Sequence, residues 1–244
     1  ILVAQIKLNE QLISVIIPTY NSRTTLKRTI EGLIEVNKFL QIEVIVIDDC
    51  STDETSNLFE SKSFSDLTIR YQRNSTNLGV SASRNRGMSI ARGAYVSFVD
   101  SDDFFLVNHR SNNFDILFFD SGCDIIFFPI NNQARSNDSY FEIIKAPELQ
   151  NNNELLIAKL NGINFHFKEA FGCLVRREAL EKNNICFPES MRMLEDLIFM
   201  SQLVAQTNSF SYTEKLEYLH VPKIGGLATS FKSNSLYDSL NAIV

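Results

Sequence analysis

Short apolar runs alternate with amphipathic stretches through the first half of the chain, and this alternation constrains the fold most. The apolar runs are rich in β-branched residues and bounded by proline or carboxylates, which is typical of buried strands. The amphipathic stretches carry apolar residues at helical spacing, as Leu26, Ile30 and Leu33 do. Strands are predicted at 14–17, 43–47, 67–71 and 95–99, and helices at 26–34, 53–59 and 81–93. This order predicts a parallel sheet with right-handed crossovers.

Polar side chains follow three of these strands at the points where the strands end. Thr19–Asn21 follow the first strand, Asp48 and Asp49 end the second, and Asp100–Asp103 follow the fourth. In an open parallel sheet, ligands bind beyond the carboxyl ends of the strands. We therefore expect these three groups to meet at one edge and to form a ligand site.

The second half of the chain is less regular. Residues 108–113 are a polar seam, and residues 131–139 are loop-like. Glu195 and Asp196 would lie in the first turn of a helix at 194–204, where acidic side chains suit the helix dipole. The other elements predicted here are strands at 124–128 and 141–144 and helices at 154–160 and 176–182.

Composition excludes several classes of protein. The net charge is −6 over 244 residues, so no overall basic field attracts nucleic acid. No apolar run approaches the roughly 20 residues that span a bilayer. The four cysteines are scattered without a Cys-x-x-Cys pair, so we expect free thiols in a reducing, cytoplasmic setting rather than a zinc site. Because the sequence does not begin with Met, we expect a segment or a processed product.

Two of the strand-end groups suggest ligands. Asp100 and Asp102, one residue apart, can share a hard cation such as Mg²⁺ or Mn²⁺, although the same pattern also fits a solvated acidic turn. Asp48 and Asp49 are adjacent carboxylates, and a base or ribose would offer hydrogen-bond donors to one of them. Arg84 lies near the start of a predicted helix, which favours phosphate, or else belongs to a solvated basic face.

Four blocks of the sequence, in this order, resemble glycosyltransferase family 2. They are Ser14–Asn21, Val46–Asp53, Asn77–Gly87 and Phe98–Asp103. The match covers residues 13–105 and extends more loosely to 225; Cys50 stands where the family often has Gly or Asn. The resemblance implies an inverting enzyme with the GT-A fold, an α/β architecture with a Rossmann-like, mostly parallel sheet and helices on both faces. Residues 1–107 would bind the donor, and residues 108–244 would form a smaller acceptor-binding half of the same domain.

The resemblance also implies roles at the donor side. Pro18, Tyr20 and Asp49 would line the nucleobase pocket, and Arg84 would lie near the base or the diphosphate. The remaining residues of the blocks that are expected to bind the donor are Thr19, Asn21, Asp48, Asn77 and Ser101.

A divalent metal, Mn²⁺ or Mg²⁺, is implied by the same resemblance. Asp102 would bind the ion directly, and Asp100 would face the ribose or the metal. His220 is a candidate third ligand, because some GT-A enzymes complete the metal shell with a late histidine, or else it is an ordinary loop residue. Asp103 is expected to shape the turn.

A catalytic base is implied in the second half. The run Leu194–Phe199 is similar to the acceptor-side block of the family, whose aspartate maps onto Asp196. Asp196 would take the proton of the acceptor hydroxyl, and Glu195 would support it or touch the acceptor. From the residues alone, both carboxylates also fit a favourable charge at a helix start.

The predicted function is transfer of a hexose from a nucleotide-sugar, with UDP favoured, to a glycan or lipid-linked glycan acceptor. The associated pathways are capsule or lipopolysaccharide synthesis at the inner face of the membrane, with peripheral membrane association left open. The alternative is a catalytically inactive relative that binds nucleotide or glycan as a partner protein. A receiver domain fits poorly, and a nucleotidyltransferase lacks its glycine-rich loop, because no glycine lies in Val15–Asn21.

Overall fold

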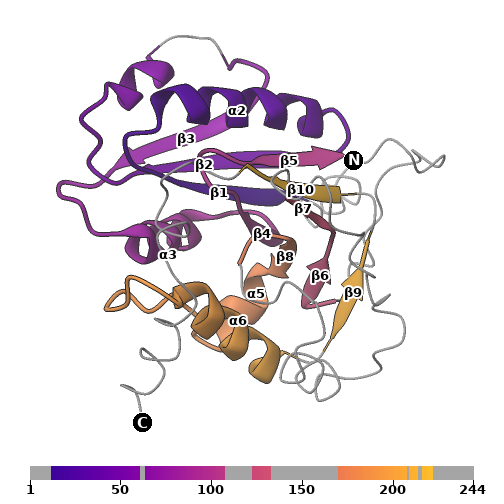
Figure 1. The fold of residues 1–244 in the computed structure, drawn as a ribbon. Coiled ribbons are helices and arrows are strands. Elements are labelled where there is room, and N and C mark those ends of the chain that lie inside the picture. The colour runs from indigo at the N-terminus through magenta and orange to yellow at the C-terminus, as the bar shows by residue number, and fades with distance from the viewer. Residues whose placement is uncertain are drawn as a thin grey trace.

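The computed structural model describes residues 12–60, 64–107, 123–132, 170–207, 209–213 and 216–221. These residues form a seven-stranded sheet of order β3-β2-β1-β4-β8-β6-β9 and a three-stranded sheet of order β5-β10-β7 (Figure 1). The predicted α/β fold class, with a mostly parallel sheet, is confirmed. The predicted elements at 141–144 and 154–160 and the seam at 108–113 lie outside the described residues.

The parallel part of the large sheet comes from the first half of the chain. Its strands are β1 (Ile13–Thr19), β2 (Ile42–Asp48), β3 (Thr68–Arg73) and β4 (Tyr95–Phe98). β1 lies between β2 and β4, with Thr19 opposite Asp48 and Ile16 opposite Phe98. Because all four strands run in the same direction, their carboxyl ends open onto one edge of the sheet.

The second half extends this sheet with shorter strands. β8 (Cys173–Arg176) pairs antiparallel with both β4 and β6 (Ile125–Phe127), and β9 (Phe210–Tyr212) pairs parallel with β6. The small sheet joins β5 (Phe104–Val107), β10 (Leu216–His220) and β7 (Ile130–Asn132). Pairing of β4 with β8 and of β5 with β10 means that residues 1–107 and 108–244 share both sheets.

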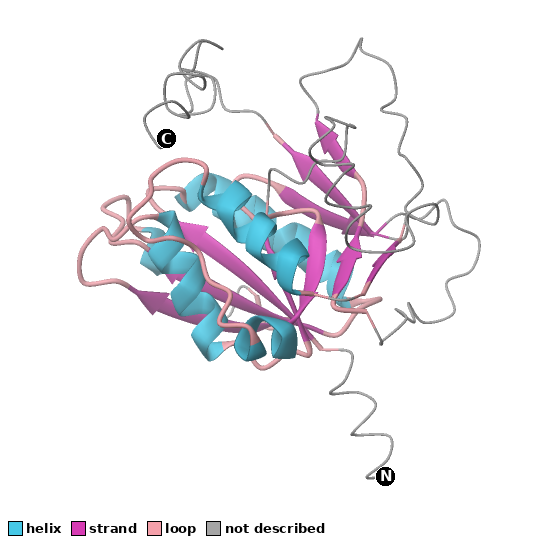
Figure 2. Cartoon of the chain, turned by 90° about the horizontal axis from the view of Figure 1, so that it is seen from below, coloured by secondary structure: helices cyan, strands magenta, loops and turns pink. Residues whose placement is uncertain are grey.

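Helices cover both faces of the large sheet, as the resemblance implies, and Figure 2 shows helices lying across its strands. α2 (Arg23–Asn37) packs its Leu26, Ile30 and Leu33 against one face in one apolar cluster. The other face meets residues of α3 (Val80–Ile90), α5 (Arg177–Lys182) and α6 (Glu195–Gln206) in a second cluster. Successive strand residues point to opposite faces, so Val15 belongs to the first cluster and Ile16 to the second.

Two helix starts differ from the sequence prediction. α3 begins at Val80 and ends at Ile90, whereas the sequence predicts 81–93, and its N-cap is Gly79, whose φ of 93° is a left-handed value that glycine adopts readily. α2 begins at Arg23, ahead of the predicted residue 26; the Ser22 hydroxyl donates to the Tyr20 carbonyl, and Asp53 accepts the Arg23 N–H at 3.0 Å. Asp53 thus ties the start of α2 to the loop before the 3₁₀ helix η1 (Thr55–Phe59). Among the described residues, every helix is too short or too polar to cross a bilayer.

Candidate active site

The loops after β1 and β2 are bonded to one another at the carboxyl edge. The Asp49 N–H donates to the Thr19 carbonyl at 2.8 Å, and Asn21 both donates its N–H to Ser51 Oγ and accepts the Thr52 N–H. Asn21 has a φ of 49°, a left-handed value that asparagine tolerates better than most residues. Asn21, which is predicted to bind the nucleotide-sugar, therefore holds together the two loops that form this edge.

Asp48 is fully buried beneath this edge. Its carboxylate accepts the Ser51 N–H at 2.8 Å and the Tyr71 hydroxyl at 2.6 Å, and Arg73 lies 3.6 Å away. Burial and the neighbouring Asp48 raise the pKa of Tyr71 well above its usual value. Of the two adjacent aspartates predicted to bind the donor, Asp48 holds β2 to β3 and does not reach the surface.

Asp49 anchors the segment that leads into α3. Its Oδ1 accepts from Asn74 Nδ2 and the Leu78 N–H, and its Oδ2 accepts the Gly79 N–H, each at 2.8 Å. Asn77 donates to the Asp49 carbonyl at 3.3 Å. Oδ2 therefore accepts one backbone N–H and can accept a further hydrogen bond, which the predicted contact with a nucleobase requires.

Three buried side-chain polar atoms in the described residues have no hydrogen-bond partner, and all belong to this edge. They are Thr19 Oγ1 at the end of β1 and Ser81 Oγ and Arg84 Nε in the first turns of α3. Buried polar atoms are normally bonded, so unpaired ones call for a reason. A polar ligand seated at the edge would supply partners for them.

Arg84 bridges the two halves of the site. Its guanidinium is buried and donates from Nη2 to Asp100 Oδ1 at 3.1 Å and from Nη1 to Asp196 Oδ1 at 2.5 Å, while Glu195 lies 3.8 Å from Nη1. Burial alone would lower the pKa of Arg84, but Asp196, Asp100 and Glu195 outweigh it and raise the pKa. Arg84 thus remains a buried cation that joins the loop after β4 to the start of α6.

The Asp196 carboxyl is largely buried and interacts with one cation and two carboxylates. Burial raises the pKa of its carboxyl, Arg84 lowers it, and the charges of Asp100 and Glu195 raise it again, to about 6. The N-cap Leu194 has a φ of 62°, so the backbone turns sharply into α6 and places Glu195 and Asp196 in its first turn. A carboxylate with a pKa near the working pH suits a general base.

An aromatic platform supports Arg84 and α6. The Arg84 guanidinium lies 5.1 Å from the centre of the Phe187 ring, which stacks on Phe199 of α6 at 4.0 Å. Asn85 holds Phe187 by donating to its carbonyl at 2.9 Å and accepting its N–H at 2.8 Å. Sequence analysis missed Asn85; the signal available was only its position next to Arg84, and its partner lies far along the chain.

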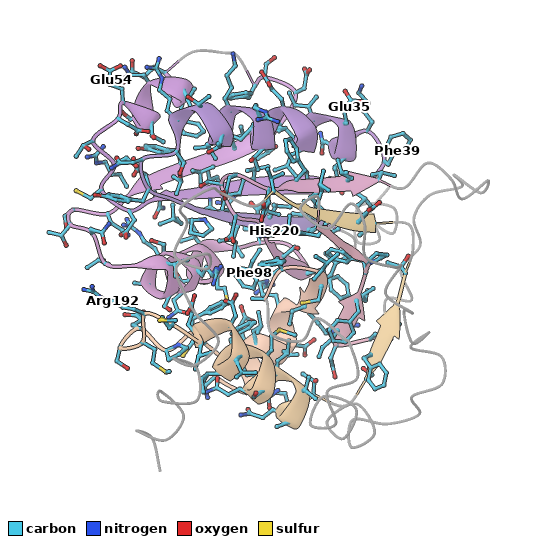
Figure 3. All side chains as sticks on the ribbon, in the orientation of Figure 1. Glu35, Phe39, Glu54, Phe98, Arg192 and His220 are labelled. Atoms are coloured by element: carbon cyan, nitrogen blue, oxygen red, sulfur yellow. The ribbon has the colours of Figure 1, made fainter. Side chains whose placement is uncertain are left out.

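Asp103 ties the small sheet to the acidic loop. Its carboxylate accepts from the Tyr218 hydroxyl at 2.6 Å and the Val221 N–H at 2.8 Å, and lies 3.0 Å from His220 Nδ1. The Tyr218 hydroxyl also accepts the Asp100 N–H. Figure 3 shows His220 near the middle of the molecule, whereas Arg192 lies at its periphery. Asp103 therefore orients β10 as well as shaping the turn, and Tyr218 is a site residue that the sequence did not reveal.

The three predicted metal ligands do not form a three-ligand cluster. In the part of the chain that the structure describes, no three His, Cys, Asp or Glu side chains come together in a way that could hold an ion. Asp100 is partly exposed, at 32% of its side chain, and Asp102 is also partly exposed. Burial raises the pKa of Asp100, Arg84 lowers it, and the nearby negative charges of Asp103 and Asp102 raise it further.

The remaining predicted residues lie around the same edge. Pro18 is buried near the end of β1, and Ser101 is buried in the loop after β4. Tyr20 is half-exposed beside Asn21, and Leu78, which precedes α3, is exposed to a similar degree. The missed residue Asn74 follows β3 at this edge, so a search of every strand end for polar residues would have found it.

A mostly parallel sheet with helices on both faces, and with carboxylates, an arginine and a helix start at its carboxyl edge, places the chain among proteins of the GT-A fold. The model of the family described as glycosyl transferase family 2 matches residues 14–183. The chain therefore belongs to glycosyltransferase family 2, as the four sequence blocks predicted.

Named relatives and solved structures agree with this membership. Poly(ribitol-phosphate) beta-N-acetylglucosaminyltransferase TarS of Staphylococcus aureus is 29% identical over 87% of this chain and 36% of its own length. A cholesterol galactosyltransferase of Borreliella burgdorferi is 30% identical over 89% of this chain and 62% of its own length. The crystal structure of S. aureus TarS 1-349 in complex with UDP-GlcNAc aligns with a TM-score of 0.71 at 27% identity, covering 90% of this chain and 61% of that one. The chain thus spans less than two thirds of the length of these relatives.

Proposed function

We propose that this chain is an inverting glycosyltransferase that moves a hexose from a nucleotide-sugar to a hydroxyl of a glycan acceptor. One observation carries the proposal: a single buried cation, Arg84, is bonded both to Asp100 of the acidic loop and to Asp196 of α6. The residues assigned to donor binding and to proton removal are therefore in one site, although Asp100 and Asp196 lie far apart in the sequence.

The carboxyl edge is suited to a nucleoside diphosphate. The first turns of α3 carry Arg84 and the unpaired Ser81 hydroxyl, and helix starts and arginine are both favourable for phosphate oxygens. Asp49, with Tyr20 and Pro18 nearby, would receive the base. TarS was solved with UDP-GlcNAc and with UDP, so a UDP-sugar is the donor that we propose.

A divalent cation fits this edge. Oxygen ligands and concentrated negative charge suit Mn²⁺ or Mg²⁺, which often takes only one or two protein carboxylates and fills its remaining positions with phosphate and water. Asp102 and Asp100 would hold the ion, and His220, oriented by Asp103, is the candidate nitrogen ligand. When bound, the ion would neutralise charge on the leaving diphosphate.

Asp196 is the proposed general base. The acceptor oxygen forms its new bond to the anomeric carbon as the bond from that carbon to the diphosphate breaks, and the hydroxyl proton passes to the Asp196 carboxylate. In-line attack from the face opposite the leaving group inverts the anomeric configuration. Such general-base help contributes roughly 10²–10⁴-fold to the rate. Glu195 supports the base by raising its pKa.

The acceptor and cellular setting are proposed from the relatives. Their names include poly(ribitol-phosphate) and minor teichoic acid biosynthesis proteins, so we propose a glycan or lipid-linked glycan acceptor in surface-polymer synthesis. We propose that the reaction takes place in the cytoplasm at the inner face of the membrane.

Donor binding can be tested by thermal unfolding with a panel of UDP-, GDP-, CMP- and dTDP-sugars, each with and without Mn²⁺. A ligand at 100 times its dissociation constant adds about 2.7 kcal/mol of stability. We expect the largest shift with a UDP-sugar plus Mn²⁺ and a reduced shift in Asp102→Asn. No metal-dependent shift with any nucleotide would refute the donor site.

Turnover separates an enzyme from an inactive nucleotide-binding relative. UDP release is measured with the donor found in the panel and a set of polymer and lipid-linked acceptors. We expect release that depends on acceptor and that is nearly abolished in Asp196→Asn. Binding without any release would favour the inactive relative.

A further inference from the structure

Arg84 has two carboxylate partners with different assigned tasks. Asp100 belongs to the donor loop and Asp196 to the acceptor side, and each receives one N–H from the same guanidinium. The side chain is 4% exposed and packs against the Phe187 ring, so water offers little competition for these bonds. A third group of Arg84, the Nε–H, is buried without a partner.

We propose that Arg84 couples the two half-sites: a bound donor diphosphate takes Arg84 away from Asp196, so that the base becomes available only after the donor has bound. The inference rests on the proposed function, because it requires a diphosphate at the carboxyl edge. It predicts that donor binds before acceptor. No covalent step is involved; one ion pair is exchanged for another.

Three features of the site favour the exchange. A diphosphate carries more charge than one carboxylate and can accept two parallel N–H bonds from a guanidinium, which a single Asp196 oxygen does not. Arg84 lies on α3. The start of this helix is held at the donor edge because the Gly79 N–H donates to Asp49. Its unpaired Nε–H gains an acceptor when the diphosphate arrives. The complex with the nucleotide-sugar therefore satisfies an N–H group that is unpaired in the empty site.

The experiment measures the affinity of UDP in the presence of Mn²⁺ by calorimetry, without any acceptor. If Arg84 is shared, removing the competing carboxylate in Asp196→Asn frees it and tightens UDP binding by roughly tenfold, the scale of one charge-assisted hydrogen bond. Glu195→Gln is the matched control. Both side chains are 16% exposed and both substitutions remove one charge, but Glu195 lies 3.8 Å from Arg84 Nη1. We expect a much smaller change in Glu195→Gln.

A second arm uses Arg84→Met. In this background Asp196→Asn should change UDP affinity by less than about twofold, since the shared cation is gone. Equal tightening by Asp196→Asn and Glu195→Gln, or tightening that persists without Arg84, would show simple charge repulsion and overturn the coupling. If Arg84→Met does not fold, Arg84→Lys takes its place. This substitution keeps the charge, so Asp196→Asn should still tighten UDP binding in the Arg84→Lys background, but by less.

The outcomes distinguish this inference from the proposed function. If UDP with Mn²⁺ does not bind the unsubstituted chain, the donor site itself is wrong. If UDP binds but Asp196→Asn leaves its affinity unchanged or weakens it, the donor site stands and the exchange of Arg84 is refuted.

Discussion

The acid side of the pH profile tests the role of Asp196 as a base. Its pKa is raised from 3.8 to about 6, mainly by burial and then by the charges of Asp100 and Glu195, against the opposing effect of Arg84. A base must be ionised, so kcat/KM should fall as the pH drops through about 6. About half the activity remains at pH 6 and about a tenth at pH 5, following a single titration.

Glu195→Gln supplies the control for this profile. Because the Glu195 charge raises the pKa of Asp196, its removal should move the acid limb to lower pH while the protein still turns over. The assay is initial UDP release at subsaturating donor between pH 4.5 and 8, with kcat/KM used because it reports the free enzyme. An acid limb near pH 4, or one that Glu195→Gln leaves in place, would refute the assignment.

Three further predictions concern stability. The folded-state pKa of Asp196 lies above its unfolded value, so its contribution should stabilise the fold as pH falls from 7 to 4, by about 2 kcal/mol; urea titrations of the unsubstituted chain and Asp196→Asn should diverge by that amount. Asn85→Ala should lower the free energy of unfolding by about 2–3 kcal/mol, because both backbone groups of Phe187 lose their partner; Tm equal to that of the unsubstituted chain would contradict this. Gly87→Ala should cost about 1–3 kcal/mol, because the new methyl group would overlap the buried Ile16 side chain, and an unchanged urea midpoint would refute that packing.

The first half of the fold could be predicted because its signals are local. Each predicted strand and helix between Ser14 and Val99 exists within a few residues, since apolar runs and helical spacing are properties of single segments. The short strands β5, β7, β8, β9 and β10 were not found as such. They have three to five residues, and pairing with segments distant in the sequence creates them, antiparallel for β5 and β8 and parallel for β7 and β9. The predicted helix at 176–182 begins one residue later, directly after β8.

The site was predictable where it follows from strand ends and not where it depends on distant partners. Thr19, Asp49 and Asp100 lie at the carboxyl edge because parallel strands bring them there. The sequence does not distinguish Asp48 from Asp49, but the Asp48 carboxylate accepts hydrogen bonds from the Ser51 N–H and the Tyr71 hydroxyl. The same limitation applies to the contact of Arg84 with Asp196 in α6 and to the contacts of Asp103 with Tyr218 and His220 in β10.

Asp196 is the proposed base and shares Arg84 with the donor loop, so turnover of the Asp196→Asn variant tests the proposed mechanism most directly. Acceptor-dependent UDP release should fall by roughly 10²–10⁴-fold, while UDP binding with Mn²⁺ is retained or tightened. Release at the rate of the unsubstituted chain would contradict the assignment of Asp196 as the base.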